Sequence, residues 1–487
     1  MISTYSKSKS ISTVHVFVLV ATIATYYFFA YNLVRTEYLK LLCLYVILWG
    51  AFIFQLKNNK SNLKYLTVSA FLLRAVFLLA IPNLSQDFYR FIWDGRMLLE
   101  GLNPYLYTPE SFINSNDFPV AQAQELYDGM GELNGSHFTN YPPIKQLCFS
   151  IAALFAGHSI LGSVVVLRLL IIAADFGTLF FGKKLLEKLN LPVRNIFWYV
   201  LNPFIIIELT GNLHFEGIMV FFLIWSLYLL HQKKWVWAAV VFALSISVKL
   251  VPLLFLPLFF NYFKNGAKHL KILSLQKNLN GTANTNETSI LLNDEPLGFS
   301  KLILFYGLIG ITIVVLFAPF FSMEFISNYS NTVALWFNKF EFNASIYYVI
   351  REMGYLFRGY NEIAIIGKIL AFIVFLSVCG LALLRRNCAT KQLLVSMLFA
   401  FTTYLFLSTT VHPWYLVTLL VLAIFTDYKF PLVWSFIIIL SYLAYLNPNS
   451  ADKSENLCII AIEYAVVYSV FIFEVITKKK YLKSSRH

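Results

Sequence analysis

The sequence predicts an all-α polytopic membrane protein, and two observations lead to that class. Hydrophobic side chains make up 59% of the 487 residues and charged side chains only 13%, whereas a soluble protein covers most of its exterior with polar and charged groups. Apolar runs of about 20 residues, the length that crosses the hydrocarbon core of a bilayer, recur along the whole chain. Backbone groups within lipid must be satisfied internally, which favours helices.

The apolar runs predict a bundle of about 14 transmembrane helices. They cover residues 13–35, 38–56, 65–82, 160–182, 195–209, 214–230, 235–248, 251–263, 301–320, 361–384, 391–410, 413–427, 430–447 and 456–476. The stretch 235–263 is divided because Pro252 and Pro257 interrupt the helical hydrogen-bond ladder. The segment 144–157 is short for a span, so we expect a half-inserted or interfacial helix. The alternative topology makes 144–157 a full span and 235–263 a single one, but it would place two basic loops outside.

The positive charges predict the orientation of the bundle. The net charge of +13 is divided among short clusters between apolar runs, so it indicates cytoplasmic loops and not a nucleic-acid partner. These basic loops lie at residues 57–64, 183–194, 231–234, 264–277, 385–391 and 478–483. They share one face in the predicted topology, which places both termini inside.

We expect residues 1–487 to form a single integral membrane domain. On the external face lie a first loop at 83–143, which is rich in Tyr, Asn, Pro and acidic residues, and a second loop at 321–360. Residues 264–300 form a predicted cytoplasmic linker, whose Asn/Thr-rich part is typical of a flexible segment. The first external loop is expected to contain amphipathic helices.

Residues 87–100 of that loop have the periodicity of an amphipathic helix. Asp87, Arg90 and Asp94 fall at i, i+3 and i+7 and form one polar stripe beside an apolar arc. We expect the apolar arc to face lipid or protein and the stripe to look along the membrane surface. Two interpretations stay open: Arg90 pairs with the aspartates in a structural cap, or the stripe carries chemistry.

Further ionisable residues fall on the same predicted face, at the ends of apolar runs. They are His214, Glu216, Lys249 and His412. Ionisable groups near the bilayer are costly and indicate function by default, although each one alone is also explained as a hydrogen-bonded core residue or a snorkelling side chain. Three other charged residues, Arg74, Arg168 and Asp175, lie deep within apolar runs and are expected to form structural pairs.

These residue types together suit the transfer of a sugar from a lipid phosphate to a hydroxyl. A carboxylate can act as general base, and Arg or Lys can hold a phosphate. The aromatic residues Trp93, Tyr105, Tyr107, Tyr141 and Trp414 are candidates for stacking on sugar rings, with membrane-belt anchoring as the alternative. No Gly-rich phosphate turn of a soluble nucleotide-binding domain is found.

The order of motifs resembles GT-C fold glycosyltransferases, and among these the bacterial polyprenol-phosphate-mannose-dependent α-mannosyltransferases. The first motif joins Asp87, Tyr89, Phe91 and Gly95 to "GLNPY" at 101–105, and "NYPPIKQL" (140–147), "LNPFIIIELTGNLHFEG" (201–217), "SVKLVPLLFLP" (247–257) and "HPWYL" (412–416) follow in the same order. The resemblance implies a GT-C bundle and an inverting transferase of the bacterial cytoplasmic (inner) membrane, with its active site facing the periplasm or exterior. It implies a polyprenyl-phosphate sugar donor, most simply mannose, a glycan or glycolipid acceptor, and membrane lipids as partners.

The resemblance also implies roles for the candidate residues. Asp87 matches the catalytic carboxylate of the family, with Asp94 as the alternative base or an acceptor ligand. Arg90 and Lys249 are the donor phosphate-binding candidates. The sugar- or acceptor-binding candidates are Trp93, Tyr105, Tyr141, His214, Glu216 and His412. No cofactor is indicated and the question of a divalent metal stays open, but a metal bridged by two adjacent acids is not expected because Gln86, and not a second acid, precedes Asp87.

Two alternatives to this function stay open. A multi-span transporter or flippase for lipid-linked glycans would also carry many spans and few charges, but transporters tend to have internal repeats and central ionisable groups. No repeat is evident here, and the candidate charges lie at one face next to a long loop. A GT-C enzyme that uses another lipid-phosphate sugar would share every feature of the sequence.

Overall fold

The protein is described here as a computed structural model covering residues 13–59, 62–265, 297–338, 340–446 and 455–484. Its elements are helices, with η for 3-10 or π segments: α1 (Thr13–Asn32), α2 (Tyr38–Asn58), α3 (Leu63–Ala75), α4 (Asp87–Leu99), α5 (Pro109–Asn114), α6 (Ala123–Gly135), α7 (Pro143–Ala156), α8 (Ile160–Lys188), η1 (Val193–Ile196), α9 (Phe197–Val200), α10 (Pro203–Ile205), η2 (Ile206–Gly211), α11 (Glu216–His231), α12 (Trp235–Val248), η3 (Val251–Leu258), α13 (Phe259–Asn265), α16 (Phe299–Phe317), η4 (Ala318–Phe320), α17 (Met323–Asn338), α18 (Ile346–Arg358), α19 (Ile363–Leu384), α20 (Thr390–Leu407), η5 (Pro413–Tyr415), α21 (Leu416–Ala423), α22 (Phe430–Ile437), η6 (Ile438–Leu446) and α23 (Leu457–Ser484). Over these ranges, pairing of extended backbone is limited to one bridge between Phe342 and Thr410. The predicted all-α class is confirmed.

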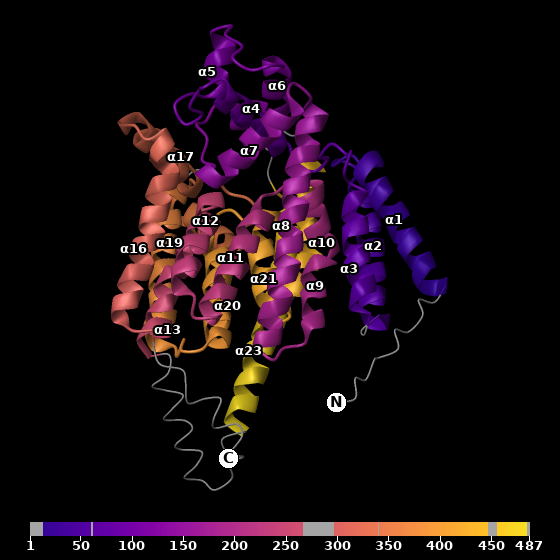
Figure 1. The fold of residues 1–487 in the computed structure, drawn as a ribbon, viewed down its shortest axis with the longest axis vertical. Helices are drawn as coiled ribbons and strands as arrows, with labels where there is room; N and C mark the ends of the chain where they lie inside the picture. Colours follow the sequence, from indigo (N-terminus) through magenta and orange to yellow (C-terminus); the bar gives the residue numbers. More distant parts are fainter. Residues whose placement is uncertain (1–12, 60–61, 266–296, 339, 447–454, 485–487) are drawn as a thin grey trace.

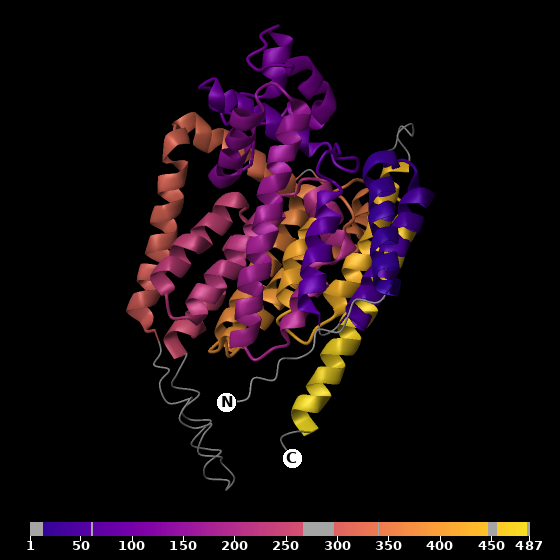
Figure 2. The same cartoon turned by 45° about the vertical axis from the view of Figure 1, so that its right-hand side comes forward.

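The helices form two layers. Long helices run side by side in a bundle, and α4, α5, α6 and α7 lie above one end of it in both views (Figures 1 and 2). The beginning of α1 and the end of α23 lie at the other end of the bundle (Figure 1). The first predicted external loop therefore forms a helical cap over the end of the bundle that is opposite the beginning of α1 and the end of α23.

Seven described helices are long and apolar enough to cross a membrane, which makes the protein a multi-span membrane protein. They are α1, α2, α8, α16 with η4, α19, α20 and most of α23. The bent pair Pro203–Gly211 and Glu216–His231 adds an eighth span if it is counted as one. The predicted number of about 14 spans is not confirmed, because several predicted runs form apolar helices shorter than the length of an independent span.

The structure supports the division of residues 235–263. The helix α12 ends at Val248, Lys249 is extended with φ −156° and ψ 140°, and η3 follows with Pro252 in its first turn. A proline is tolerated at that position because the N–H that it lacks would have no hydrogen-bond partner within the first turn of the helix. The break places the Lys249 side chain at a helix end and not within a continuous span.

The cap is held together by close packing of α4 against α7. Gly95 lies so near the backbone carbonyl of Phe149 that an added Cβ would collide with it, and the rings of Phe91 and Phe149 stack with centroids 4.7 Å apart. The helix α4 is buried on nearly every side. The expectation that the polar stripe looks along the membrane surface is therefore wrong for Arg90 and Asp94, because neighbouring parts of the cap cover that side of the helix.

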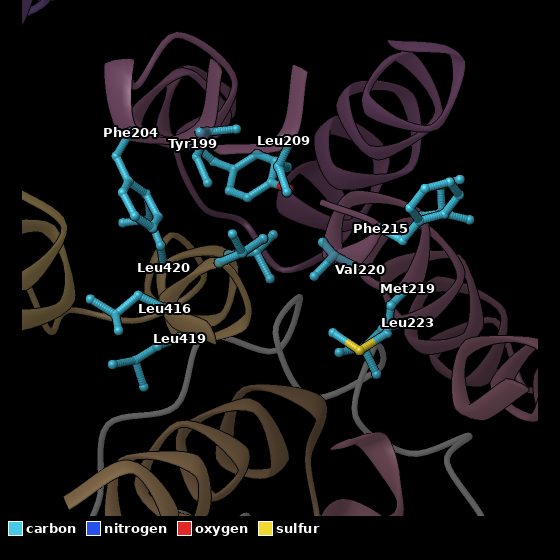
Figure 3. Packing of buried hydrophobic residues seen from close by; sticks show 14 of the residues in the cluster. Tyr199, Phe204, Leu209, Phe215, Met219, Val220, Leu223, Leu416, Leu419 and Leu420 are labelled. Carbon is cyan, nitrogen blue, oxygen red and sulfur yellow. The ribbon is translucent and has the colours of Figure 1, made fainter. Parts of the chain in front are cut away.

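One apolar core joins the bent segment to the rest of the bundle. Figure 3 shows Met219, Val220 and Leu223 of α11 and Leu416, Leu419 and Leu420 of α21 around a common interior, with Tyr199, Phe204 and Leu209 from the segment before the bend. The two halves of the bent pair meet at 114°. This packing holds the turn between them, residues 212–215, beneath the cap.

The charged residues within the bundle are structural, with one difference from the expectation. Arg74 and Asp175 form a fully buried ion pair with Nε and Oδ2 2.8 Å apart, as predicted. Arg168 has no carboxylate partner in the described part of the chain; its guanidinium donates to the carbonyls of Leu78, Thr210 and Gly211 at 2.7–3.1 Å. These carbonyls lie at the ends of helical segments, where no following turn supplies an N–H, and the Arg168 guanidinium donates to them instead.

Candidate active site

Asp87 begins α4 at the lower side of the cap, where it is only partly exposed. Its backbone N–H faces the Ser85 hydroxyl at 3.4 Å, and the Asn134 side chain of α6 donates to Oδ1 at 3.4 Å. Burial raises the pKa of the carboxyl above its ordinary 3.8, while Lys145 and the Asn134 hydrogen bond act in the opposite direction. The carboxylate is thus held loosely and retains free acceptor positions, as a general base requires.

Arg90 and Asp94, which follow Asp87 on α4, form an ion pair within the cap. Arg90 Nε is 2.7 Å from Asp94 Oδ1, and Gln146 donates to Asp94 Oδ2 at 3.0 Å. The same guanidinium donates to the carbonyls of Asn134 and His137 at 2.5 and 2.9 Å. Both members are buried, so in this structure they join α4 to α6 and α7.

Two of the aromatic candidates are also enclosed by the cap. The Trp93 ring is fully buried and its Nε1 donates to the Met97 sulfur at 3.0 Å. The Tyr105 ring packs among Phe320, Phe325 and Tyr329, and its hydroxyl donates to the Tyr141 carbonyl at 2.5 Å. The structure does not bring the Trp93 or Tyr105 ring to the surface beside Asp87.

A buried ion pair joins the two helix ends below the cap. Glu216 begins α11, where the helix dipole favours a negative charge, and its carboxylate accepts a hydrogen bond from Lys249 Nζ. Lys249 lies 4.3 Å above the Tyr415 ring, and its side chain is 28% exposed against 4% for Glu216. Asp87 interacts electrostatically with both members of this pair, so the three residues belong to one charge cluster.

A stack of four rings forms another side of the site. His214 stacks on Trp414 with centroids 3.8 Å apart, Trp414 on His412 at 4.5 Å, and His412 on Phe342 at 4.8 Å. His214 follows Leu213, a non-glycine residue with a left-handed φ of 61°. Such backbone is retained where the surroundings require it. Here it sets the His214 ring against Trp414, with Nε2 3.6 Å from a Glu208 carboxylate oxygen.

Comparison with known proteins assigns the chain to a family. A family model described as alpha-(1->6)-mannopyranosyltransferase, N-terminal domain, matches residues 6–263, more than half of the chain. The chain belongs to this family. Over 176 residues it is 25% identical to alpha-(1->6)-mannopyranosyltransferase A of Mycobacterium tuberculosis, and the aligned part covers 36% of this chain and 32% of that relative.

The alpha-(1->6)-mannopyranosyltransferase match confirms the resemblance predicted from the motif order. It includes the whole cap and the bent segment, and it ends within α13. Asp87, His214, Glu216 and Lys249 therefore lie inside the matched part of the family, whereas His412 and Trp414 reach the same site from the later helices. The roles of all these residues stay proposals.

One residue of the site received no role from the sequence. Lys145 lies in the first turn of α7, and it interacts electrostatically with Asp87, Glu216 and Lys249. The signal for it was present in the sequence, because Lys145 is the single charged residue of an otherwise apolar segment, 144–157. Ionisable residues in such segments indicate function.

Within residues 13–59, 62–265, 297–338, 340–446 and 455–484, no three His, Cys, Asp or Glu side chains gather closely enough to hold a metal ion.

Proposed function

We propose that the protein is an inverting mannosyltransferase that moves mannose from a polyprenyl phosphate to a hydroxyl of a glycan or glycolipid acceptor on the external face of the membrane. The observation that carries the proposal is the position of Asp87, a partly exposed carboxylate with one long hydrogen bond, beside two lysines at one end of a membrane bundle. The family membership and the activity for which the relative is named support the choice of mannose.

The reaction that fits this site is a single displacement. The Asp87 carboxylate takes the proton of the acceptor hydroxyl while the hydroxyl oxygen forms a bond to C1 of the mannosyl group. The bond between C1 and the phosphate oxygen breaks, and its electron pair leaves with the polyprenyl phosphate. Attack opposite the leaving group inverts C1, so a β-linked donor yields an α-linked product, the anomer in the relative's name.

The distribution of positive charge supports an external site. Basic residues occupy the last turns of α2, α8 and α13, at the end of the bundle away from the cap. Cytoplasmic ends of spans are enriched in Lys and Arg. The cap and the Asp87 cluster then face the periplasm or exterior, where a lipid-linked sugar, and not a nucleotide sugar, supplies the mannose.

The donor class is tested directly by supplying donors to the purified protein in nanodiscs. We expect transfer of labelled mannose from polyprenyl-phosphate mannose to octyl α-mannoside and none from GDP-mannose. Product analysis by mass spectrometry and linkage determination checks the result. Transfer from GDP-mannose alone would contradict a lipid donor, and transfer from polyprenyl-phosphate glucose alone would exclude mannose as the donor sugar.

An apolar cavity supports a lipid donor as well. A cavity of about 320 Å³ lies between η3, α19 and α20, lined by Leu254, Ala371 and Phe375 among other apolar side chains. Tyr404 also lines it, and the Tyr404 hydroxyl interacts electrostatically with Lys249. An isoprenoid chain in this cavity would have its phosphate end directed toward the charge cluster.

Filling the cavity is expected to impair the use of long-chain donors. Ala371→Trp should raise KM at least tenfold for undecaprenyl-phosphate mannose and leave KM for a citronellyl-phosphate donor within about threefold, because even one methylene in an apolar pocket is worth about 1–3 kcal/mol. Ile369→Trp is the matched control, since Ile369 is on the same helix and does not line the cavity. Equal KM changes for the two donors would contradict this placement of the lipid chain.

A further inference from the structure

The Lys145 ammonium is enclosed by aromatic rings. Its Nζ lies 4.0 Å from the ring centroid of Tyr141, 4.7 Å from Phe91, 5.4 Å from Phe215 and 6.0 Å from Phe149. The residue is only 8% exposed. Rings at these distances stabilise a cation through their quadrupoles, and together they hold the end of a flexible side chain in one place.

The charge of Lys145 has no contacting counter-ion. No carboxylate lies within ion-pair distance of its Nζ, and no side-chain hydrogen bond is formed, among the residues that the structure describes. The two other cations near the site are paired, Lys249 with Glu216 and Arg90 with Asp94. A buried charge without a partner is costly, so the site is arranged to receive an anion at Lys145.

The electrostatics of the surrounding helices agree with anion binding at Lys145. Burial lowers the pKa of Lys145 to about 8, and Lys249 acts in the same direction. The carboxylates of Glu216, Asp87 and Asp94 raise it without touching the ammonium. An anion in direct contact with Nζ would supply the stabilisation that these carboxylates supply only at a distance.

We propose that Lys145, held in the cage of Phe91, Tyr141, Phe149 and Phe215, binds the phosphate of the lipid donor and stabilises it as the leaving group. The inference rests on the proposed function for the identity of the anion. When the bond from C1 to the phosphate oxygen breaks, a phosphodiester with one negative charge becomes a phosphomonoester with up to two. A fixed ammonium therefore binds the leaving group more tightly than the donor, which lowers the barrier.

This assignment changes the expected role of Lys249. Because Glu216 already neutralises Lys249 by direct contact, that pair adds little net charge for a phosphate. The pair instead joins the starts of two segments, α11 and η3, at the edge of the site. The proposal makes Lys145, and not Lys249, the principal cation for the donor.

The test measures binding without turnover, with farnesyl phosphate, farnesol and inorganic phosphate as probes of the full-length protein in detergent. Wild type should bind farnesyl phosphate at least tenfold more tightly than farnesol or inorganic phosphate. Lys145→Met should weaken farnesyl phosphate binding at least tenfold and leave farnesol unchanged, whereas Lys145→Arg should stay within about threefold of wild type. Lys184→Met is the matched control, because Lys184 Nζ also lies 4.0 Å over a ring, that of Phe180, at the far end of α8.

The pH dependence of wild-type binding gives a readout that needs no variant. Farnesyl phosphate is fully ionised above pH 7 because its second pKa is about 6. Binding should therefore weaken about tenfold between pH 7.5 and 9.5 as Lys145 loses its proton, and Lys145→Arg should remove this change. The charged groups that face Lys145 are Asp87 and Asp94 of α4, Glu216 of α11 and Lys249 at the end of α12, and Lys145→Arg leaves all four of them in place.

The outcomes separate this inference from the proposed function. Unchanged farnesyl phosphate binding in Lys145→Met, or no pH dependence in wild type, would overturn the role of Lys145 even if mannose transfer is observed. Inorganic phosphate binding as tightly as farnesyl phosphate would overturn the lipid-phosphate assignment. Lys145-dependent binding without mannose transfer from any lipid phosphate would support the anion site and reject the proposed function.

Discussion

Asp87→Asn is expected to lower kcat for mannose transfer by about 10²–10⁴-fold, the usual contribution of a general base. The amide has the size and shape of the carboxylate and can keep the contact with Asn134, but it cannot accept the proton of the acceptor hydroxyl. KM for the donor should change by less than about threefold, since Lys145 is the proposed phosphate-binding residue. Initial rates at saturating donor, with folding checked by size-exclusion chromatography, measure the effect.

Asp94→Asn is the matched control for this prediction. It removes the same charge about two turns further along α4, but Asp94 is fully buried and pairs with Arg90. We expect a lower unfolding temperature and a kcat per folded molecule within about tenfold of wild type. The opposite pattern, an inactive but stable Asp94→Asn and an active Asp87→Asn, would identify Asp94 as the base.

As the pH is lowered, the activity should begin to fall at a higher pH than it would if the general base were an exposed aspartate. Burial raises the Asp87 pKa above 3.8, so the carboxylate takes up a proton earlier as the pH falls, and only the deprotonated form is a base. The acid limb of kcat/KM should therefore lie above pH 3.8 in wild type. An acid limb at or below pH 3.8 would contradict Asp87 as the titrating base.

Arg74→Met is expected to lower the free energy of unfolding by about 3–5 kcal/mol, because it leaves a fully buried carboxylate without its partner. The change also removes the donors to the Val200 and Ala70 carbonyls. Unfolding of the detergent-solubilised protein with increasing SDS measures the effect. Lys40→Met is the control, because Lys40 pairs with Glu37 at an exposed site, where such pairs contribute about 0–1 kcal/mol.

A double variant separates the charge from the packing. Arg74→Met with Asp175→Leu removes the unpaired carboxylate as well, so it should be more stable than Arg74→Met alone. The Val200 carbonyl still lacks its donor in the double variant, so full recovery is not expected. A double variant less stable than Arg74→Met would mean that the carboxylate of Asp175 has a further partner in the folded state.

The site illustrates how far the motif order predicts spatial neighbours. Asp87, Glu216 and Lys249 are more than 150 residues apart along the chain from first to last, yet their charges interact in the structure. The prediction placed the helix ends that carry these residues on the same face of the membrane. Helix ends on the same face lie near each other once the helices pack into a bundle. Arg90, Trp93 and Tyr105 show the limit of that reasoning, because periodicity identifies the face of a helix but not what covers it.

The amino-acid sequence by itself determined the all-α membrane class, the family and the helix ends that carry polar groups, because apolar length, basic loops and motif order are local properties of a chain. Only the tertiary structure decided which charges are neutralised. Arg90 and Asp94 are paired within the cap, Glu216 pairs with Lys249, and Lys145 is left among aromatic rings. Pairing depends on distances between segments remote in the chain, and these exist only after the helices have packed.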